Sequence, residues 1–474
     1  MKIEINNFGP INKANMQISP LTIIIGRNNL GKSFIAQLIY SILQSLSPFR
    51  RSPHFVENNT MFIWNEALPD QYIKSRRNSE KIFSDCFKSW KSGDITFQEF
   101  HANIVENWFN SYKEQLKISI PSTLEGVFST KITDLISLNS TSCRINMVLS
   151  PCLRINITIR RKNVLDIKIV FDKTFYINLL STDKNLKDLY AKHPRASASS
   201  RYEMFYTTER IFRNNIASQL NIAVPYYIPA GRGGLLDAWD TISTAWINMA
   251  PTSILRGISM PPLPGTASIF YTTLLGLSGT YKGPFYSLCS QFEKIIDGQI
   301  ELSQQSKIKG KKDIYYLFET NGKSTKIPII HAASMIKEIG PLYLFIKEIL
   351  AKHDLFIIEE PESHLHPTAQ RDLMKILVSL VQKGTNVVFT THSDLLLRSV
   401  THEVFRKVIS HEKPLISLED LAIYLIKQGA KGSVSTKIKI GKYGSLDRIP
   451  TFDEVFKELY DEEIRLEIIG HANT

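Results

Sequence analysis

The amino-terminal part of the chain alternates between apolar and polar residues before it becomes apolar. Residues 2–8 and 15–25 largely show this period-two pattern, which is typical of strands, with a turn expected around Gly9 and Pro10. The second strand ends in a β-branched run. The apolar positions that follow recur at helical spacing: Phe34, Ile35, Leu38, Ile39, Ile42, Leu43 and Leu46. The pattern therefore predicts a buried strand, a short loop and a helix.

The loop between this strand and helix has the sequence of a phosphate-binding loop. Residues 26–33 read Gly-x-x-x-x-Gly-Lys-Ser. Glycine allows backbone conformations that other residues avoid, so successive N–H groups can converge on phosphate oxygens at the start of the helix. In such a P-loop Lys32 reaches the β- and γ-phosphates, and Ser33 reaches Mg²⁺. The predicted ATP-binding residues here are Gly26, Arg27, Asn28, Asn29, Leu30, Gly31, Lys32, Ser33 and Phe34.

Two kinds of periodicity occupy the middle of the chain. Helical periodicity is clear over Phe97–Leu116, and a second helical region is expected at Asp188–Leu220. Between them, from Arg144 to Leu180, short alternating segments are separated by turn residues, which predicts an antiparallel meander. A hairpin is expected within Ile300–Ile327.

A short strand predicted over Ala223–Pro229 runs into the turn Ala-Gly-Arg-Gly-Gly at residues 230–234. An arginine held between glycines at the end of a strand is typical of a functional turn. A tight turn that displays Arg232 at the surface is the alternative interpretation.

Two further strands end in polar residues suited to phosphate chemistry. Apolar residues 355–358 run into Glu359 and Glu360, as at the end of a Walker B strand. There the first carboxylate holds Mg²⁺ through water, and the second polarises the attacking water. Residues 386–391 form another buried strand, followed by His392, which could hydrogen-bond the γ-phosphate. Taken alone, His392 would be a structural histidine; beside a P-loop and a Walker B strand, we interpret it as catalytic.

Composition limits the class of protein. The 474 residues exceed what a single core usually holds, so more than one structural unit is expected. The net charge of +12 favours a polyanionic partner, and DNA is one candidate. The four cysteines show neither zinc-site nor disulfide spacing. No signal-peptide pattern and no long apolar run occurs, so we expect a cytoplasmic protein without direct membrane insertion.

Together these motifs resemble the ABC-type ATPase heads of the SMC, RecF and OLD families, especially the OLD-like AAA ATPases of genome-maintenance and anti-phage modules. The resemblance rests on residues 26–33, on Glu-Glu-Pro-Glu-Ser-His-Leu-His-Pro at 359–367 and on Thr-Thr-His-Ser at 390–393. It covers residues 1–47 and 325–400 well and the middle hardly at all. It implies an α/β fold: an ABC-type head with an antiparallel β subdomain and a largely helical insertion.

The resemblance also implies roles for individual residues. Residues 363–366 would be the D-loop, His392 the switch histidine and residues 332–338 the signature segment, whose Ser334 meets ATP bound to a second subunit. The chain departs from the family at Glu359, where aspartate is usual, and at Met335, where glycine is usual. No residue matches the usual Q-loop glutamine.

The spacing of the motifs predicts a split head. Residues 1–60 and 326–474 would form its two halves, the second with a helical tail, and residues 61–325 would form the meander and insertion. The interpretation is a Mg²⁺-dependent ATPase subunit that self-associates and controls a separately encoded effector in DNA processing or anti-phage defence. A nucleotide-gated scaffold with little turnover is one alternative. A DNA nuclease is the other, although the acidic cluster of the family's nuclease domain is missing from residues 401–474.

Overall fold

The computed structural model describes most of the chain in separate stretches. The described residues are 1–46, 70–151, 153–162, 164–172, 203–211, 223–245, 265–303, 312–405, 416–441 and 457–465, with a few isolated residues between them. The chain divides into two compact units. The first comprises residues 1–4, 38–136 and 140–225, and the second comprises residues 5–37, 137–139 and 226–474. The boundary predicted near residue 60 lies outside the described residues.

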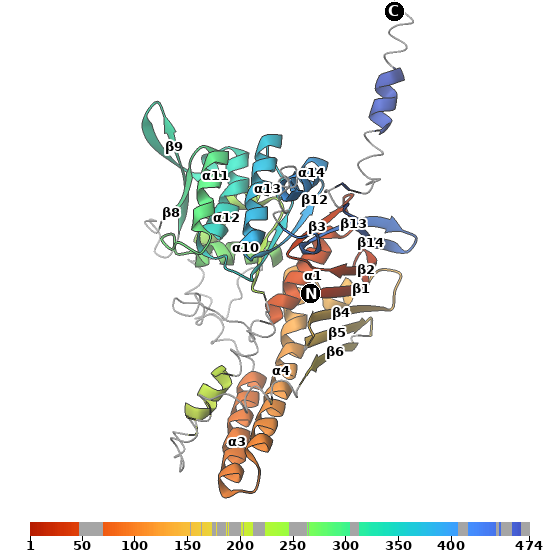
Figure 1. Ribbon diagram of the computed structural model, residues 1–474, viewed down its shortest axis with the longest axis vertical. Coiled ribbons are helices and arrows are strands. Elements are labelled where there is room, and N and C mark those ends of the chain that lie inside the picture. Colours follow the sequence, from red (N-terminus) through yellow and green to blue (C-terminus); the bar gives the residue numbers. More distant parts are fainter. Residues whose placement is uncertain are drawn as a thin grey trace, which may run out of the picture. The chain divides into compact units, whose positions relative to one another are not determined.

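Two long helices dominate the first unit (Figure 1). Helix α3 (Asp70–Ser92) packs against helix α4 (Phe97–Phe128). The ring of Phe83 meets that of Phe100 edge-on, with 5.7 Å between their centroids, in a cluster of buried aromatic side chains. The helix predicted over Phe97–Leu116 is confirmed, and it continues for three further turns because its apolar face does.

The first unit also contains the predicted meander. Strands β4 (Ser142–Ser150), β5 (Leu153–Arg160) and β6 (Val164–Phe171) pair antiparallel in that order. Alternate residues of β5 are buried, as its period-two pattern requires. The part of the prediction that extends to Leu180 lies outside the described residues, apart from Ile177.

A mostly parallel sheet forms the centre of the second unit. Its strands are β1 (Lys2–Phe8), β2 (Ile11–Gln17), β3 (Leu21–Gly26), β7 (Pro225–Ile228), β11 (Leu355–Glu359), β12 (Asn386–Thr391), β13 (Leu421–Gly429) and β14 (Gly432–Ile438). Their order across the sheet is β1-β2-β14-β13-β3-β12-β11-β7. Strand β3 runs parallel to both β12 and β13, and β12 runs parallel to β11. All residues of β3 and β11 are buried, which explains their unbroken apolar runs.

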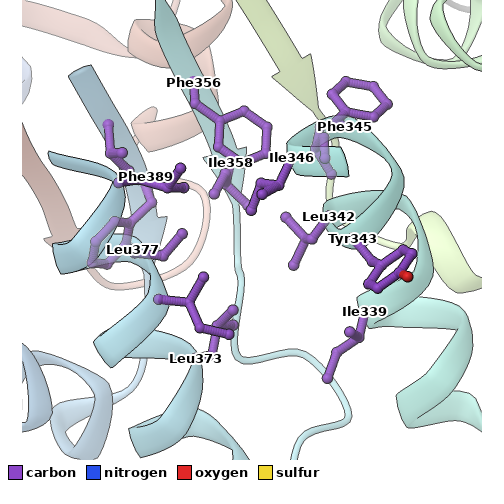
Figure 2. Close-up of a cluster of buried hydrophobic side chains, with 14 of the residues drawn as sticks. Ile339, Leu342, Tyr343, Phe345, Ile346, Phe356, Ile358, Leu373, Leu377 and Phe389 are labelled. Carbon is purple, nitrogen blue, oxygen red and sulfur yellow. The ribbon is translucent and has the colours of Figure 1, made fainter. Parts of the chain in front are cut away.

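Helices cover this sheet. They are α8 (Arg232–Asp237), α10 (Gly265–Gly276), α11 (Cys289–Ile296), α12 (Ser334–Glu348), α13 (Pro367–Gln382) and α14 (Asp394–Phe405), together with the start of α1 (Lys32–Ser45), whose residues 38–45 belong to the first unit. Figure 2 shows the main core, where Leu342 and Ile346 of α12 and Leu373 of α13 converge on Phe356 and Ile358 of β11. This packing fixes the strand that ends in Glu359.

A small separate sheet lies beside these helices (Figure 1). Strands β8 (Gln299–Ser303), β9 (Asp313–Thr320) and β10 (Lys323–Pro328) are antiparallel, so the hairpin expected within Ile300–Ile327 is part of a three-stranded sheet. None of the helices in the described stretches is long and apolar enough to cross a membrane.

The fold class is α/β, as predicted: a P-loop on a largely parallel sheet, together with an antiparallel β subdomain and long helices. The carboxyl-terminal part differs in detail from the predicted helical tail. Residues 457–465 are helical, but β13 and β14 precede them, and β13 lies directly beside β3. The central position of β13 depends on pairing with a strand about 400 residues earlier, which local periodicity does not report.

Candidate ATP site

The P-loop joins β3 to α1 in a conformation that requires its two glycines. Gly26 has a φ of +148°, and a Cβ there would lie 2.4 Å from the carbonyl oxygen of Ile426 on β13. Gly31 has a φ of +97°, and a Cβ there would lie 2.5 Å from the side chain of Ile11 on β2. The loop is therefore pressed against neighbouring strands, with no room for side chains at these positions. Between them Arg27, Asn28 and Asn29 are exposed, and Leu30 is half-buried.

Lys32 folds back over this loop. Its Nζ donates hydrogen bonds to the carbonyl oxygens of Gly26, at 3.0 Å, and Arg27, at 2.9 Å. Burial lowers the pKa of Lys32 from 10.5 to about 8, and the nearby carboxylates, Glu360 foremost, partly oppose this shift. A triphosphate in the loop would supply the negative charge that favours the ammonium form.

Ser33 and Phe34 open the helix behind the loop. Ser33 is half-buried in the first turn of α1. Phe34 packs edge-on against Phe8, with 6.0 Å between ring centroids, and lies against Gly9. The position of Phe34 is thus explained by packing under the loop, and its predicted part in ATP binding stays a prediction.

The Walker B strand ends beside the P-loop because parallel strands β3, β12 and β11 place their carboxyl ends at one edge of the sheet. Glu359 is buried, and its Oε2 accepts a hydrogen bond from the backbone N–H of Ala230 at 3.2 Å. Its Oε1 is also buried and has no hydrogen-bond partner among the described residues. A buried carboxylate oxygen without a partner is costly unless a cation or water completes it.

Glu360 has an unusual backbone for a non-glycine residue, with a φ of +44°. Left-handed backbone at such a residue costs about 1–3 kcal/mol and is common at functional sites. The backbone N–H of Glu360 donates to the carbonyl oxygen of Thr390 at 3.0 Å, and its carboxylate accepts from the hydroxyl of Ser363 at 3.4 Å. Its Oε1 lies 3.6 Å from Nε2 of His392. The carboxylate is half-exposed and turned toward the end of β12.

His392 is held from behind by Glu362. The Oε1 of Glu362 accepts hydrogen bonds from the backbone N–H of His392, at 2.8 Å, and from the hydroxyl of Thr391, at 2.7 Å. Burial lowers the pKa of His392, and the positive charge of Lys32 adds to this effect, so the imidazole is neutral at neutral pH. Burial likewise raises the pKa of Glu362. Sequence reasoning gave Glu362 no role, although it lies in the specific Glu-Glu-Pro-Glu run.

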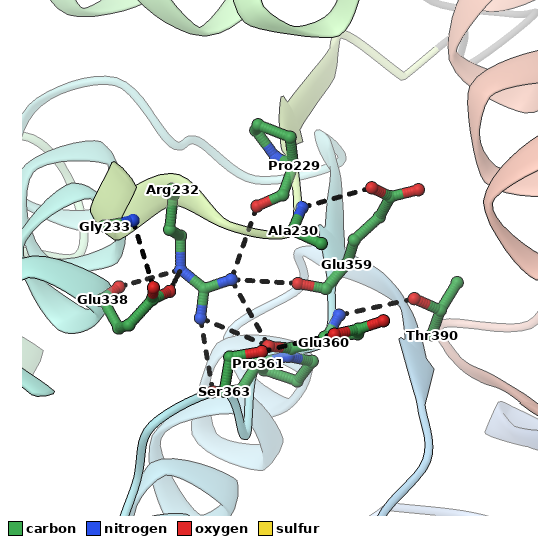
Figure 3. A network of polar contacts seen from close by, with 10 residues as sticks. All are labelled: Pro229, Ala230, Arg232, Gly233, Glu338, Glu359, Glu360, Pro361, Ser363 and Thr390. Atoms are coloured by element: carbon green, nitrogen blue, oxygen red, sulfur yellow. Dashed lines mark hydrogen bonds and ion pairs between the residues drawn. The ribbon is translucent and has the colours of Figure 1, made fainter. Parts of the chain in front are cut away.

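Like the role of Glu362, the position of the Arg232 side chain is revealed only by the structure. Its side chain is fully buried, so the interpretation as a surface arginine is wrong. Figure 3 shows its guanidinium between α12 and the turn at the end of β11. Burial lowers the pKa of Arg232, and Glu338 opposes the shift with a contact of 3.1 Å.

Ser334, the predicted signature serine, is the first residue of α12 and is exposed. No hydrogen bond in the described part of the chain joins it to the P-loop. This placement agrees with a role toward a second molecule, which stays a prediction.

The residues present fit a nucleotide with a divalent cation. The orphaned Oε1 of Glu359 and the hydroxyl of Ser33 are oxygen ligands of the kind that Mg²⁺ prefers, used together with phosphate oxygens. The bare backbone at Gly26 and Gly31 lets phosphates approach closely.

Two protein-family models match parts of the chain. The family model described as "AAA ATPase domain" matches residues 1–223, and the one described as "AAA domain, putative AbiEii toxin, Type IV TA system" matches residues 338–398. A search of curated proteins found no match.

The solved structures that match include SMC heads. The SMC head domain from Thermotoga maritima is 10% identical over 93% of this chain and 98% of its own, with a TM-score of 0.38. The Smc head domain of Pyrococcus furiosus with an extended coiled coil, bound to the C-terminal domain of ScpA, is 10% identical over 98% of both chains, with a TM-score of 0.38.

A P-loop, a carboxylate pair and a histidine at the ends of adjacent parallel strands define a nucleotide-binding P-loop ATPase fold. With the two family models that match its amino-terminal and Walker B regions, this site supports an ABC-type AAA ATPase of the SMC/RecF/OLD class.

Proposed function

We propose that this protein hydrolyses ATP with Mg²⁺, and that ATP controls its self-association and thereby a separately encoded effector. One observation supports the first part above all. The second unit brings Lys32, Glu359, Glu360 and His392, which are up to 360 residues apart in the sequence, to the same edge of one sheet.

Each residue then has a distinct task. Lys32 exchanges the carbonyls of its own loop for the β- and γ-phosphates, and the P-loop N–H groups complete the cradle. Ser33 and Glu359 would hold Mg²⁺, which would supply positive charge beside the phosphates when bound. Glu360 orients and deprotonates the attacking water. Neutral His392 donates a hydrogen bond to the γ-phosphate.

One chain would provide only part of the contacts to ATP, and a second copy of the chain would complete them. The exposed Ser334 at the start of α12 would contact the γ-phosphate of ATP bound to the partner, as in ABC-type dimers. ATP would then favour the associated state because it binds that state more tightly.

The description of one matching family model supports the proposed effector and setting. One of the two matching models carries the description of a putative toxin in a type IV toxin–antitoxin system, which supports control of a separately encoded partner in anti-phage defence. DNA is the other candidate partner, because the net charge is +12.

A steady-state phosphate-release assay with Lys32→Ala as the matched control tests the proposal. We expect Mg²⁺-dependent release by the natural protein and none by the variant, which loses the charge on the β/γ-phosphates. ATP binding without turnover would instead identify a nucleotide-gated scaffold. Plasmid cleavage with Mg²⁺ or Mn²⁺ would identify a nuclease.

A further inference from the structure

We propose that Arg232 is a positioning residue that couples helix α12, which begins at the signature serine, to the turn that carries Glu359 and Glu360. This inference rests on the proposed ATPase function. It assigns to the buried arginine a task in turnover that is separate from nucleotide binding.

The guanidinium binds the backbone of the catalytic turn. Nη1 donates to the carbonyl oxygen of Glu359 at 2.9 Å, and both Nη1 and Nη2 donate to that of Glu360, at 3.4 and 3.3 Å. Nη2 also donates to the carbonyl oxygen of Pro361 at 3.4 Å (Figure 3). These acceptors lie on either side of the left-handed residue Glu360, so Arg232 stabilises the strained conformation that turns its carboxylate toward His392.

The same guanidinium is tied to α12. Its Nε donates to the carbonyl oxygen of Glu338 at 2.9 Å and lies 3.1 Å from the Oε2 of that residue. The Oε1 of Glu338 accepts from the backbone N–H of Gly233 at 3.1 Å. Glu338 lies in the first turns of α12, four residues after Ser334. One buried group therefore bridges the signature helix and the catalytic turn.

The turn that holds Arg232 is built for this contact. A Cβ at Gly233 would lie 2.7 Å from Oε1 of Glu338, so a larger residue there would displace the carboxylate that binds Arg232. The backbone N–H of Ala230, two residues before the arginine, binds the carboxylate of Glu359. The segment from Ala230 to Gly233 thus contacts both Walker B carboxylate residues and α12.

A rigid bridge of this kind has a consequence for regulation. Planar guanidinium donors fix the relative orientation of the groups they bind. When Ser334 docks on a partner's ATP, a shift of α12 would be passed through Glu338 and Arg232 to the carbonyls around Glu360. The position of the catalytic carboxylate, and not the P-loop, would respond to docking.

Two variants of the bridge and one control test the inference. Arg232→Lys keeps the charge but cannot reach all these acceptors, and Glu338→Gln keeps the shape but removes the ion pair. Lys326→Ala breaks an ion pair in the three-stranded sheet, between Lys326 and Glu301 at 2.7 Å, which does not touch the catalytic turn. Affinity for ATP is measured by calorimetry and turnover by phosphate release, both on the full chain.

We expect kcat to fall by about 10²-fold in Arg232→Lys, the scale of a misplaced catalytic group, while the Kd for ATP stays within about threefold. Glu338→Gln should show the same split to a smaller degree, and Lys326→Ala should match the natural protein. In one further variant, Arg232→Ala, added guanidinium should restore part of the turnover.

An unchanged kcat in both bridge variants would overturn the inference. So would a loss of ATP affinity in both, because the contact would then serve the fold rather than the position of Glu360. If the natural protein itself released no phosphate, the proposed ATPase function would fail instead, and the two failures are thus distinguishable.

Discussion

Glu360 and His392 face each other across the ends of two adjacent strands, with 3.6 Å between Oε1 and Nε2. This separation is longer than a good hydrogen bond, so the two side chains do not occupy each other's hydrogen-bonding groups. Because burial and Lys32 lower the pKa of His392, the pair is a carboxylate beside a neutral imidazole at neutral pH. One group can then accept a proton while the other donates a hydrogen bond.

Replacing Glu360 by glutamine should separate ATP binding from hydrolysis. Gln keeps the size of the side chain but cannot take a proton from water, so turnover should fall by at least ~10² while the Kd for ATP is retained. Phosphate release and calorimetry on the same preparation measure the two quantities. If this variant hydrolyses ATP at the wild-type rate, Glu360 is not the general base and another residue takes that role. His392→Ala is then the next variant to measure.

Binding of ATP should take up a proton near pH 8. The pKa of Lys32 is about 8 in the nucleotide-free protein, and phosphate charges raise it, so about half of the sites gain a proton on binding at that pH. The uptake should vanish near pH 6.5, where Lys32 is already charged, and affinity should fall as the pH rises above 8. Calorimetry in buffers of different ionisation enthalpy gives the number of protons.

Lys32→Arg is the control for this proton, because a guanidinium remains charged throughout the range. The uptake near pH 8 should disappear in the variant, even if its affinity for ATP is weaker. Equal proton uptake by both proteins would show that a group other than Lys32 is protonated when ATP binds.

Removal of the Glu362 carboxylate should weaken both the fold at β12 and catalysis. Glu362→Ala leaves the backbone N–H of His392 and the hydroxyl of Thr391 without their acceptor, at a cost of about 1–3 kcal/mol in the free energy of unfolding. Denaturant unfolding measures this cost. Glu362→Gln, which keeps one acceptor oxygen, should lose less stability.

The pH dependence of stability distinguishes the charge of Glu362 from its shape. Because its pKa in the folded protein is raised, its contribution to stability is most favourable below about pH 4.5 and is lost as the pH rises through the folded pKa. Glu362→Gln should remove this part of the pH dependence. If the free energy of unfolding of Glu362→Gln depended on pH as that of the natural protein does, the assignment of this pH dependence to Glu362 would be wrong.

ATP should increase the mass of the Glu360→Gln variant in sedimentation with Mg²⁺. The expected cause is a second subunit whose Ser334 completes the γ-phosphate contacts. The same mass with and without ATP would mean either a constant oligomer or no shared site. Ser334→Arg decides between them, because a bulky cation at a real intersubunit contact should abolish hydrolysis without weakening ATP binding to the P-loop.

Local sequence determined the parts of the site that are continuous in the chain. The P-loop follows from Gly26, Gly31 and Lys32, since only glycine adopts the required backbone and the helix start supplies its N–H groups. The ends of β11 and β12 were predictable as well, because an apolar run that stops at polar or charged residues is typical of a buried strand reaching the edge of a sheet.

Only the tertiary structure decided which distant groups support these segments. Whether an arginine between glycines is exposed or buried depends on what packs over it, and Glu338 and the carbonyls of the catalytic turn come from other parts of the chain. The position of β13 could not be predicted from the sequence for the same reason, because its place beside β3 is set by pairing across the sheet. Periodicity records which face of a segment is buried, but the identity of the neighbour is fixed only when the chain folds.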